Sequence, residues 1–402
     1  MRNQSATLSA AGEALRGSPQ SGLRAQNERL VLTLIRQNGP LSKAEIARIS
    51  GLSAQTVSVI MRALEADGVL EKCEPVRGKV GQPQVPMRLA RSGAFFFGLK
   101  VGRRSLDLIL TDFLGKVLSR VHLTHRYPTP DGVVRFAHDA IGQLRDQLTP
   151  TEQARIAGLG IAIPFRLWDW ARPLGVQEAD MAAWRDRDIR AEIAGQCDFP
   201  VYLQNDASAA CGAELVFGAT EDLRDFLYFF VGFFIGGGVV LNRTLCTGRS
   251  GNAGALGSMP VGTGSGRLRQ LVDVASLSVL DKAVQAAGGS TEAMWEMPQG
   301  WDLPEPVLSD WIEGAATGLA HAIAASASVI DFEAAVIDGW LPPELRARLV
   351  EATGRRLAAL IVPGIDLPRL RPGTIGSDAR ALGAASLPLS DRFLLDQSCL
   401  LS

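Results

Sequence analysis

The sequence predicts an α/β protein with a small helical domain at its N-terminus and a larger α/β body. Its 402 residues are too many for one compact core, so two or three domains are expected. In the first part of the chain, apolar residues recur at helical spacing between short turns that contain glycine. Beyond residue 93, strand-like and helix-like segments alternate, which is typical of an α/β fold.

Charge is divided unevenly between these two parts. Residues 1–90 contain 12 Lys and Arg against 7 Asp and Glu, a net charge of +5. This leaves 29 of the 41 basic and 35 of the 42 acidic residues for the rest of the chain, a net charge of −6. A basic head favours contact with an anionic polymer, although ordinary scatter of charge is an alternative.

Cysteine content and hydropathy exclude several classes of protein. The five cysteines are far apart and form no C-x-x-C pair, so we expect neither a disulfide framework nor a thiolate metal site, and we expect a reducing cytoplasm. The N-terminus lacks the apolar core of a signal peptide. The most apolar stretch, Phe226–Leu241, is interrupted by glycines and is shorter than the roughly 20 residues that span a bilayer. It predicts a buried strand, a turn and a second strand, and no membrane contact.

The N-terminal domain is expected over residues 23–90, after a flexible arm of residues 1–22 rich in Ser, Gly, Ala and Gln. A first helix begins near Asn27, with Leu30, Leu34 and Ile35 on one face, and ends at an Asn-Gly-Pro sequence. A second helix starts with a capping box in which Ser42 is the N-cap and Glu45 follows three residues later. A tight turn then leads to a third helix, and Ser53 is its expected N-cap.

The third helix and the segment after it carry the expected contacts to another molecule. Val57, Ile60, Met61 and Leu64 form its buried stripe, whereas the start and the other face carry side chains that can reach base edges or phosphates in a major groove: Ser53, Gln55, Thr56, Ser58 and Arg62. The Gly-rich segment 76–83 predicts the tip of a basic hairpin that contacts DNA through Arg77, Lys79 and Gln82. This order predicts a winged helix-turn-helix that binds double-stranded operator DNA as a homodimer, with a protein-binding helical bundle as the alternative.

The body begins with three expected strands, over residues 95–100, 105–111 and 116–122. Five further segments follow in a fixed order, and they are Gly158–Pro164, Val201–Ala207, Ile235–Gly238, Gly251–Gly254 and Gly376–Ala385. Together with the N-terminal domain, they resemble the ROK family, whose name stands for repressors, open reading frames and kinases. The resemblance covers most of the chain.

This resemblance implies that residues 91–402 form a two-lobed actin-like ATPase fold, which is ribonuclease H-like, with a sugar site between the lobes. Lobe 1 is expected over about 91–204 plus the C-terminal helix, and lobe 2 over about 205–375. Members of the family are sugar kinases or sugar-responsive regulators, and only the regulators carry the winged helix.

The kinase chemistry of the family is largely missing from this chain. Asp206 matches the general base, although a role in capping the helix that starts at Ala207 is an alternative. Lys100 stands where an acidic residue would help to hold Mg²⁺, and the bulky Arg103 and Arg104 replace glycine in the first phosphate motif. Phe233 and Phe234 replace Thr-Gly in the second phosphate loop. We therefore expect no enzyme and no cofactor, with Asp206 as a vestige of the base.

The sugar and zinc motifs of the family also differ here. The Glu-x-Gly-His motif reads Ala255–Ser258, and the cysteine knuckle falls on Thr263–Gln270, which contains no cysteine. A structural zinc site needs four nitrogen or sulfur ligands, so we expect no metal.

Two interpretations of the cleft remain open. In one, it binds a sugar or a sugar derivative through the polar and aromatic side chains of Asn205, Asp206, Asn252, Ser258 and Trp168. The alternative for Trp168 is packing between the lobes, and the favoured alternative for Arg103 and Arg104, which could hold an acidic or phosphorylated ligand, is a solvated turn. In the other, the cleft is empty and the body serves only for dimerisation.

The sequence as a whole predicts a cytoplasmic ROK-type transcriptional regulator of carbohydrate-related genes, with repression favoured over activation. It would bind its operator as a homodimer and respond to a small ligand in the cleft. The alternative is a sugar kinase with an appended DNA-binding head, and a third possibility is an adaptor that binds protein through its N-terminal bundle.

Overall fold

The computed structural model describes residues 19–75, 84–165, 167–170, 176–262 and 268–395. Contacts between residues divide the chain into two units. The smaller contains the described residues of 1–94 and 389–396, and the larger contains those of 95–388. Each unit is described by itself below.

The smaller unit contains the predicted helices. They are α2 (Pro19–Asn38), α3 (Lys43–Ser50) and α4 (Ala54–Ala66). The capping box is confirmed, because Ser42 N donates to the Glu45 carboxylate over 2.8 Å and Glu45 N donates to Ser42 Oγ over 3.3 Å. Ser53 is confirmed as the N-cap of α4, where its hydroxyl accepts from Thr56 N.

A short hairpin follows the three helices. Strands β1 (Leu70–Lys72) and β2 (Met87–Leu89) pair antiparallel, and Cys73 N donates to Pro86 O beyond the end of β1. The hairpin tip that was predicted over residues 76–83 lies outside the described residues.

Two details of the first helix differ from the prediction. Helix α2 begins at Pro19, so residues 19–22 of the predicted arm are helical, and the rest of that arm lies outside the described residues. The predicted stripe of Leu30 and Leu34 is only partly buried. The third predicted member, Ile35, is buried as expected, and Val31 and Leu32 join it in the core.

The end of the C-terminal helix also departs from the expected assignment to lobe 1. Helix α16 (Ala379–Phe393) belongs to the larger unit up to Pro388, and residues 389–396 group with the smaller unit. Within the smaller unit, Leu395 N donates to the hydroxyl of Thr33 on α2 over 2.9 Å. Residues at the end of α16 and just after it thus contribute to the packing of the helical domain.

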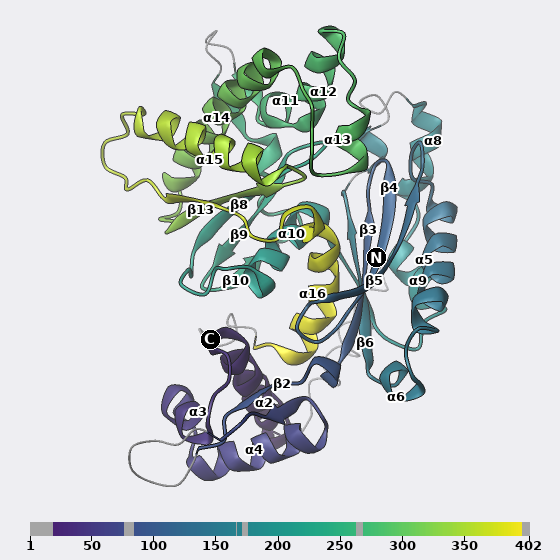
Figure 1. Ribbon diagram of the computed structural model, residues 1–402, viewed down its shortest axis with the longest axis vertical. Coiled ribbons are helices and arrows are strands. Elements are labelled where there is room, and N and C mark those ends of the chain that lie inside the picture. Colours follow the sequence, from purple (N-terminus) through teal and green to yellow (C-terminus); the bar gives the residue numbers. More distant parts are fainter. Residues whose placement is uncertain (1–18, 76–83, 166, 171–175, 263–267, 396–402) are drawn as a thin grey trace, which may run out of the picture. The chain divides into compact units, whose positions relative to one another are not determined.

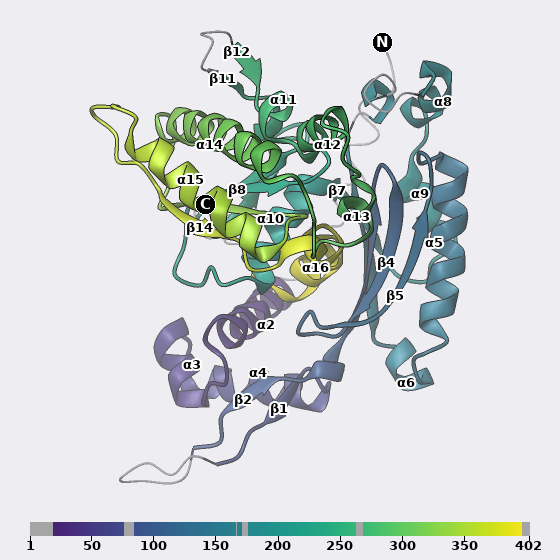
Figure 2. The same cartoon turned by 45° about the horizontal axis from the view of Figure 1, so that its top comes forward.

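Lobe 1 of the larger unit is built on a sheet of order β5-β4-β3-β6-β7. Its strands are β3 (Phe95–Val101), β4 (Ser105–Thr111), β5 (Val117–Thr124), β6 (Ile156–Ile163) and β7 (Val201–Asn205). The three predicted strands are confirmed as β3, β4 and β5, which pair antiparallel, whereas β6 and β7 run parallel to β3. Helices α5 (Pro130–Arg145) and α9 (Ile189–Ala194) lie side by side along one face of this sheet (Figures 1 and 2). Short helices α6 (Pro150–Gln153) and α8 (Glu178–Ala182) lie in its connections.

Lobe 2 repeats this pattern with a sheet of order β10-β9-β8-β13-β14. Its strands are β8 (Phe226–Val231), β9 (Gly236–Leu241), β10 (Thr244–Cys246), β13 (Ala334–Gly339) and β14 (Arg369–Pro372). As in lobe 1, three antiparallel strands are joined to two parallel ones. The predicted strand, turn and strand within 226–241 are therefore confirmed. Two sheets with the same strand order are the signature of the two-lobed fold that the resemblance implied.

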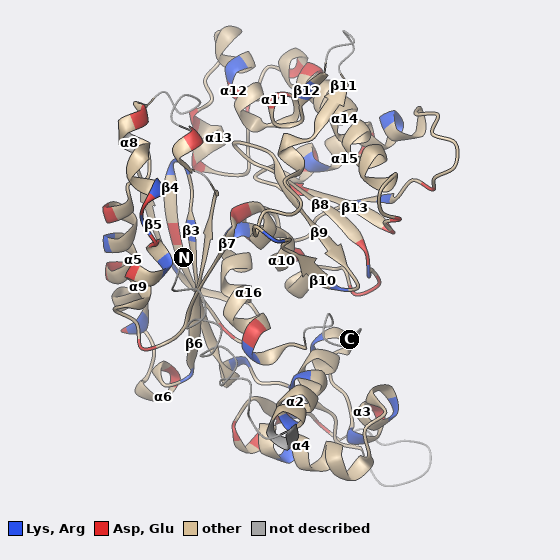
Figure 3. Ribbon diagram, turned by 180° about the vertical axis from the view of Figure 1, so that it is seen from behind, with Lys and Arg blue, Asp and Glu red and all other residues tan. Residues whose placement is uncertain are grey.

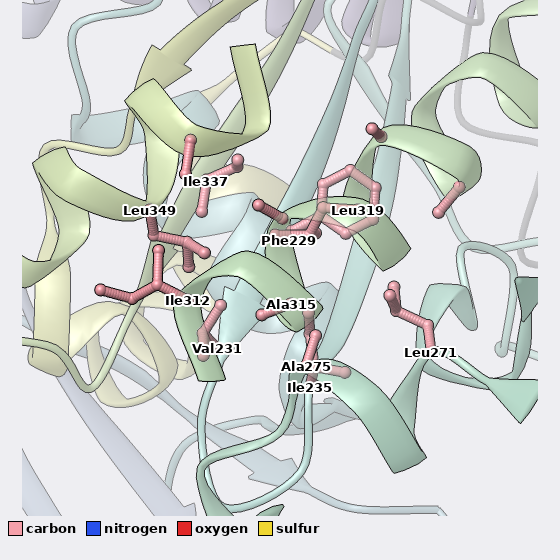
Figure 4. Packing of buried hydrophobic residues seen from close by; sticks show 14 of the residues in the cluster. Phe229, Val231, Ile235, Leu271, Ala275, Ile312, Ala315, Leu319, Ile337 and Leu349 are labelled. Carbon is pink, nitrogen blue, oxygen red and sulfur yellow. The ribbon is translucent and has the colours of Figure 1, made fainter. Parts of the chain in front are cut away.

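Helices cover the lobe 2 sheet. Helix α14 (Glu305–Ala327) packs on it together with α15 (Pro343–Ala358), and Figure 4 shows Leu319 of α14 beside Phe229 of β8. The rest of the lobe consists of α11 (Val272–Ala275), α12 (Leu277–Ala286), α13 (Glu292–Glu296) and a hairpin of β11 (Pro260–Gly262) and β12 (Leu268–Gln270).

Helices α10 (Asp206–Phe217) and α16 connect the two sheets through close backbone contacts. Helix α10 contacts strands of both sheets. A Cβ atom on Gly160 of β6 would lie 1.8 Å from Ala384 O of α16, and one on Gly383 of α16 would lie 1.8 Å from Ala209 O of α10. Only glycine permits these approaches. They hold the strand–helix junction after β7 at a fixed place between the lobes.

Candidate functional site

Helix α4 presents the predicted polar face in the smaller unit. Gln55 and Arg62 are exposed, and Thr56 and Ser58 are half-buried. The opposite side of the helix is buried through Val57, Ile60, Met61 and Leu64, as predicted. Ser53 and Thr56 are engaged with each other, because their hydroxyls lie 2.8 Å apart. Within the helix, Gln55 and Arg62 are thus the predicted side chains that are exposed, and Arg62 Nε donates to Ser58 O over 3.1 Å.

Sequence reasoning missed two residues on this face. Lys43 is the first residue of α3, and its Nζ lies 3.4 Å from Ser58 Oγ, so its ammonium group adds positive charge beside α4. Figure 3 shows basic residues on α3. Val59 is 47% exposed on α4, and a valine can contact a thymine methyl group. The helical period of α4 places Val59 beside Arg62 and could have revealed it, whereas the position of Lys43 depends on how α3 and α4 cross.

Strands β1 and β2 form the hairpin from which the predicted tip extends. Arg88 on β2 donates to Glu71 on β1 over 2.6 Å. Arg77, Lys79 and Gln82, the predicted contacts of the tip, lie outside the described residues, so their role stays a prediction.

A cavity of about 450 Å³ lies between the lobes of the larger unit. Its wall includes Asn205, Asp206, Asn252 and Ser258, so the structure brings together all four predicted polar contacts. Trp168 does not belong to this wall. It packs partly buried against the core of lobe 1, so it is not placed to stack on a ligand in this cavity.

Asn205 and Asp206 are adjacent at the junction of β7 and α10, and their side chains make different contacts. Asn205 is the N-cap of α10, where its Oδ1 accepts from Ala207 N over 3.0 Å and from Ser208 N over 3.3 Å. The suggestion that Asp206 caps this helix is therefore wrong. Its Oδ2 instead lies 3.5 Å from Nη1 of Arg380 on α16. The side chains of Asp206 and Arg380 are largely buried, at 14% and 12% exposure respectively.

Arg103 contradicts the favoured expectation of a solvated turn. It is 8% exposed and lines the cavity, and its guanidinium carbon lies 4.2 Å from the ring centroid of Phe234. Burial lowers the pKa of Arg103 to about 10, with Asp206 raising it and Arg380 lowering it further. The group is thus cationic at neutral pH. The neighbouring Arg104 is exposed and stacks over Trp295 at 5.5 Å and Phe233 at 5.8 Å.

Lys100 is held in an ion pair. Its Nζ donates to Asp107 Oδ2 over 2.5 Å, and His122 Nδ1 lies 2.6 Å from the other oxygen of this carboxylate. The three residues face one another across strands β3, β4 and β5. Burial raises the pKa of Asp107, but Lys100 and His122 outweigh it and lower the pKa to about 2. The position that would help to hold a metal is therefore occupied by a cation with its own counterion.

A model of the ROK family matches residues 96–390 of this sequence. The chain belongs to the ROK family. A winged helix-turn-helix DNA-binding model matches residues 24–71, which covers α3, α4 and most of α2. The predicted family and fold are thereby confirmed.

Known relatives of this ROK protein include regulators and kinases. It is 27% identical to the xylose repressor of Bacillus subtilis over 246 residues, which is 60% of this chain and 62% of the repressor. The chain thus spans about three fifths of the length of that relative. A crystal structure described as a ROK family transcriptional regulator, a homolog of the Escherichia coli MLC protein, matches with a TM-score of 0.66 and 21% identity, covering 93% of this chain and 98% of that one. The ROK hexokinase of Thermus thermophilus matches with a TM-score of 0.51 and 25% identity, covering 74% and 99%.

The described residues contain no group of three or more His, Cys, Asp or Glu side chains arranged to hold a metal ion. Residues 263–267 of the expected knuckle position lie outside them, whereas Gln270 lies on the cavity wall, a role that sequence reasoning missed. Across the described ranges, no helix combines the length and the apolar character needed to cross a bilayer.

Proposed function

We propose that this ROK protein is a DNA-binding transcriptional regulator whose activity is set by a small ligand in the cavity between the lobes. The observation that carries the proposal is the exposed polar face of α4, on a helix-turn-helix joined to a ROK body. An α-helix fits the major groove, and Gln55 and Arg62 are side chains that read or clamp DNA there. A chain that binds chromosomal DNA would act in the cytoplasm.

A homodimer is the form in which such a reader is most selective. One recognition helix contacts only a few base pairs, and a second copy one helical turn away multiplies the specificity. The operator would then be an inverted repeat.

The way the cavity is built supports control by a ligand. Asn205 and Asp206 come from the junction after lobe 1, and Asn252 and Ser258 come from lobe 2. A ligand that touches both sides binds one spacing of the lobes better than another and so shifts the population between them. Likeness to a xylose repressor supports a carbohydrate-related ligand and repression as the response.

The alternative function is a sugar kinase, and the similarity to a ROK hexokinase is the observation that favours it. Three features support a regulator without kinase activity. Asp206 forms an ion pair with Arg380. Lys100 forms an ion pair with Asp107. The two arginines of the β3–β4 turn, Arg103 and Arg104, lie over the rings of Phe234 and Phe233. A coupled phosphorylation assay with ATP, Mg²⁺ and a panel of aldoses tests this. Turnover that is lost in Asp206→Asn would establish a kinase.

DNA binding is tested by selecting genomic fragments with the purified full-length protein and sequencing them. The expected result is enrichment of a few fragments that share an inverted repeat. Arg62→Ala should abolish the enrichment, and Arg190→Ala, which removes an exposed arginine from α9 of the other unit, should preserve it. Enrichment of no fragment, or equal enrichment by Arg62→Ala, would favour the adaptor that binds protein.

A further inference from the structure

Three exposed side chains follow one line along helix α4. Gln55, Val59 and Arg62 are spaced four and three residues apart, which places them on a single face of a helix with about 3.6 residues per turn. This face lies opposite the buried stripe of α4. A molecule that covers it therefore meets an amide, an isopropyl group and a guanidinium in that order.

The hydroxyl groups beside this line already have contacts within the helical domain. The hydroxyl of Thr56 lies 2.8 Å from that of the N-cap serine, and Ser58 Oγ lies 3.4 Å from Nζ of Lys43. Thr56 and Ser58 are also half-buried, whereas Gln55 and Val59 are exposed. The neutral side chains of α4 that are best placed to distinguish one base pair from another are therefore Gln55 and Val59.

Gln55 and Val59 match different groups of an A·T base pair. A glutamine amide can form two hydrogen bonds with adenine in the major groove, one to N7 and one from the 6-amino group. An isopropyl group forms no hydrogen bond, but it can pack against the 5-methyl group of thymine. Val59 is 47% exposed, so such packing would remove apolar surface from water. Arg62 can pair with guanine or with any phosphate, so its charge alone specifies no sequence.

The rise of the helix sets the distance between the base pairs that these two side chains reach. Four residues of an α-helix advance by about 6 Å, and successive base pairs are about 3.4 Å apart. When α4 lies along the major groove, Gln55 and Val59 therefore meet base pairs that are one or two steps apart.

We propose that Gln55 and Val59 make A·T base pairs the specific element of each operator half-site. Gln55 forms hydrogen bonds with an adenine, and Val59 packs on the methyl group of a thymine within about two base pairs of it. This inference rests on the proposed function and specifies the sequence class of the DNA. Because the Val59 contact is made to one methyl group, it can be removed from the DNA without any change to the protein.

Replacement of thymidine by deoxyuridine tests the Val59 contact, because it removes only the 5-methyl group and keeps the base pair. The full-length protein is titrated by fluorescence anisotropy with a fragment enriched from genomic DNA, and each thymidine of the inverted repeat is replaced in turn in both half-sites. One replacement should weaken binding by the wild type at least about fourfold, which is the effect of one buried methyl group. Val59→Ala should bind the two forms of that fragment equally, within about twofold. Val329→Ala, which removes the same atoms from an 81% exposed valine of the larger unit, should keep the wild-type difference.

Replacement of an A·T pair by G·C tests Gln55 in the same assay. At the adenine neighbouring the sensitive thymine, this change should weaken binding by the wild type at least about tenfold and binding by Gln55→Ala less than about threefold. Gln143→Ala, which removes an exposed glutamine from α5 of the larger unit, should respond as the wild type does.

Three results would overturn the inference. They are a wild type that binds its enriched fragment but responds to no deoxyuridine, a response that Val59→Ala leaves unchanged, and a preference for adenine that persists in Gln55→Ala. Each of these results requires specific binding to DNA, so it leaves the proposed function in place. A protein that enriches no fragment would instead overturn the proposed function, and this inference with it.

Discussion

Asp206 Oδ2 lies 3.5 Å from Nη1 of Arg380, and the guanidinium carbon of Arg380 in turn lies 4.9 Å from the ring centroid of Phe230. A carboxylate that serves as a general base must be within reach of a substrate hydroxyl and ready to accept its proton. Here the carboxylate is matched by a buried cation that helix α16 carries. The residue that matches the base of the family's kinases is here part of the charged wall of the cavity.

Nucleotide binding should be absent for the same structural reasons. Lys100, Arg103 and the rings of Phe233 and Phe234 occupy the places where the family's kinases present acidic, small and hydroxyl-bearing residues. Addition of 5 mM ATP with Mg²⁺ should raise the melting temperature by less than about 1 °C, because a ligand stabilises only the state that it binds. A rise of several degrees that disappears without Mg²⁺ would contradict this expectation.

The pair of Lys100 and Asp107 should behave as a buried ion pair. Their side chains are 10% and 7% exposed, so Lys100→Met leaves a buried carboxylate without its main counterion and should cost about 3–5 kcal/mol of unfolding free energy. The double variant Lys100→Met with Asp107→Leu should recover more than half of that loss, since neither charge remains. Urea unfolding of the wild type, Lys100→Met, Asp107→Leu and the double variant measures this, and a double variant as unstable as the sum of the two single variants would refute it.

His125 should make the protein less stable in mild acid. Burial lowers the pKa of His125 from 6.5 to about 4, and repulsion from Lys100 adds to the effect. Between these two pH values the unfolded chain binds a proton that the folded chain does not, so stability falls as the pH drops through this window. Above pH 7 the residue has no such effect.

The melting temperature from pH 7 to pH 4 checks this expectation. His125→Asn should flatten the decline relative to the wild type, and His138→Asn on α5 is the control for loss of a histidine elsewhere. An equal decline in the wild type and His125→Asn would show that other groups cause the acid sensitivity.

Glycine at 160 should be required for the contact between β6 and α16. A methyl group there would meet Ala384 O at 1.8 Å, so Gly160→Ala should cost about 3 kcal/mol or more. Gly142→Ala is the matched control, because a methyl group on this residue of α5 meets nothing within 4 Å and alanine favours a helix by about 0.5–1 kcal/mol. Thermal unfolding should separate the two variants in opposite directions, and equal melting temperatures would contradict the packing described here.

Features that depend on neighbouring residues could be predicted from the sequence. The Ser42–Glu45 capping box, the N-cap at Ser53 and the stripe of α4 depend on residues three or four apart, so their geometry follows from the helix itself. Asn205 and Asp206 were placed correctly in the cleft by their resemblance to a family motif, but the resemblance did not say which of them caps α10.

Features that depend on distant partners were not predictable in the same way. Arg103 is buried because Phe234, from the turn between β8 and β9, covers it, and Asp206 is engaged because Arg380 arrives on the last helix. Trp168 packs in lobe 1 instead of facing the cavity, since the turn that carries it folds back on its own sheet. In α2, Ile35 was predicted correctly, but both Leu34 and Val31 can share a helical face with it, and only the packing of α3 and α4 decides that Val31 is the buried one.

The most direct test of the central claim is the salt dependence of DNA binding, measured by fluorescence anisotropy on a fragment enriched from genomic DNA. If α4 reads DNA in the major groove, the affinity should fall steeply between 50 and 200 mM salt, as it does when phosphate contacts release counterions. Arg62→Ala should weaken binding at least about tenfold, and Arg190→Ala should not change it. An affinity that does not respond to salt, or that is the same in the wild type and Arg62→Ala, would contradict the assignment of this chain as a regulator that reads DNA with α4.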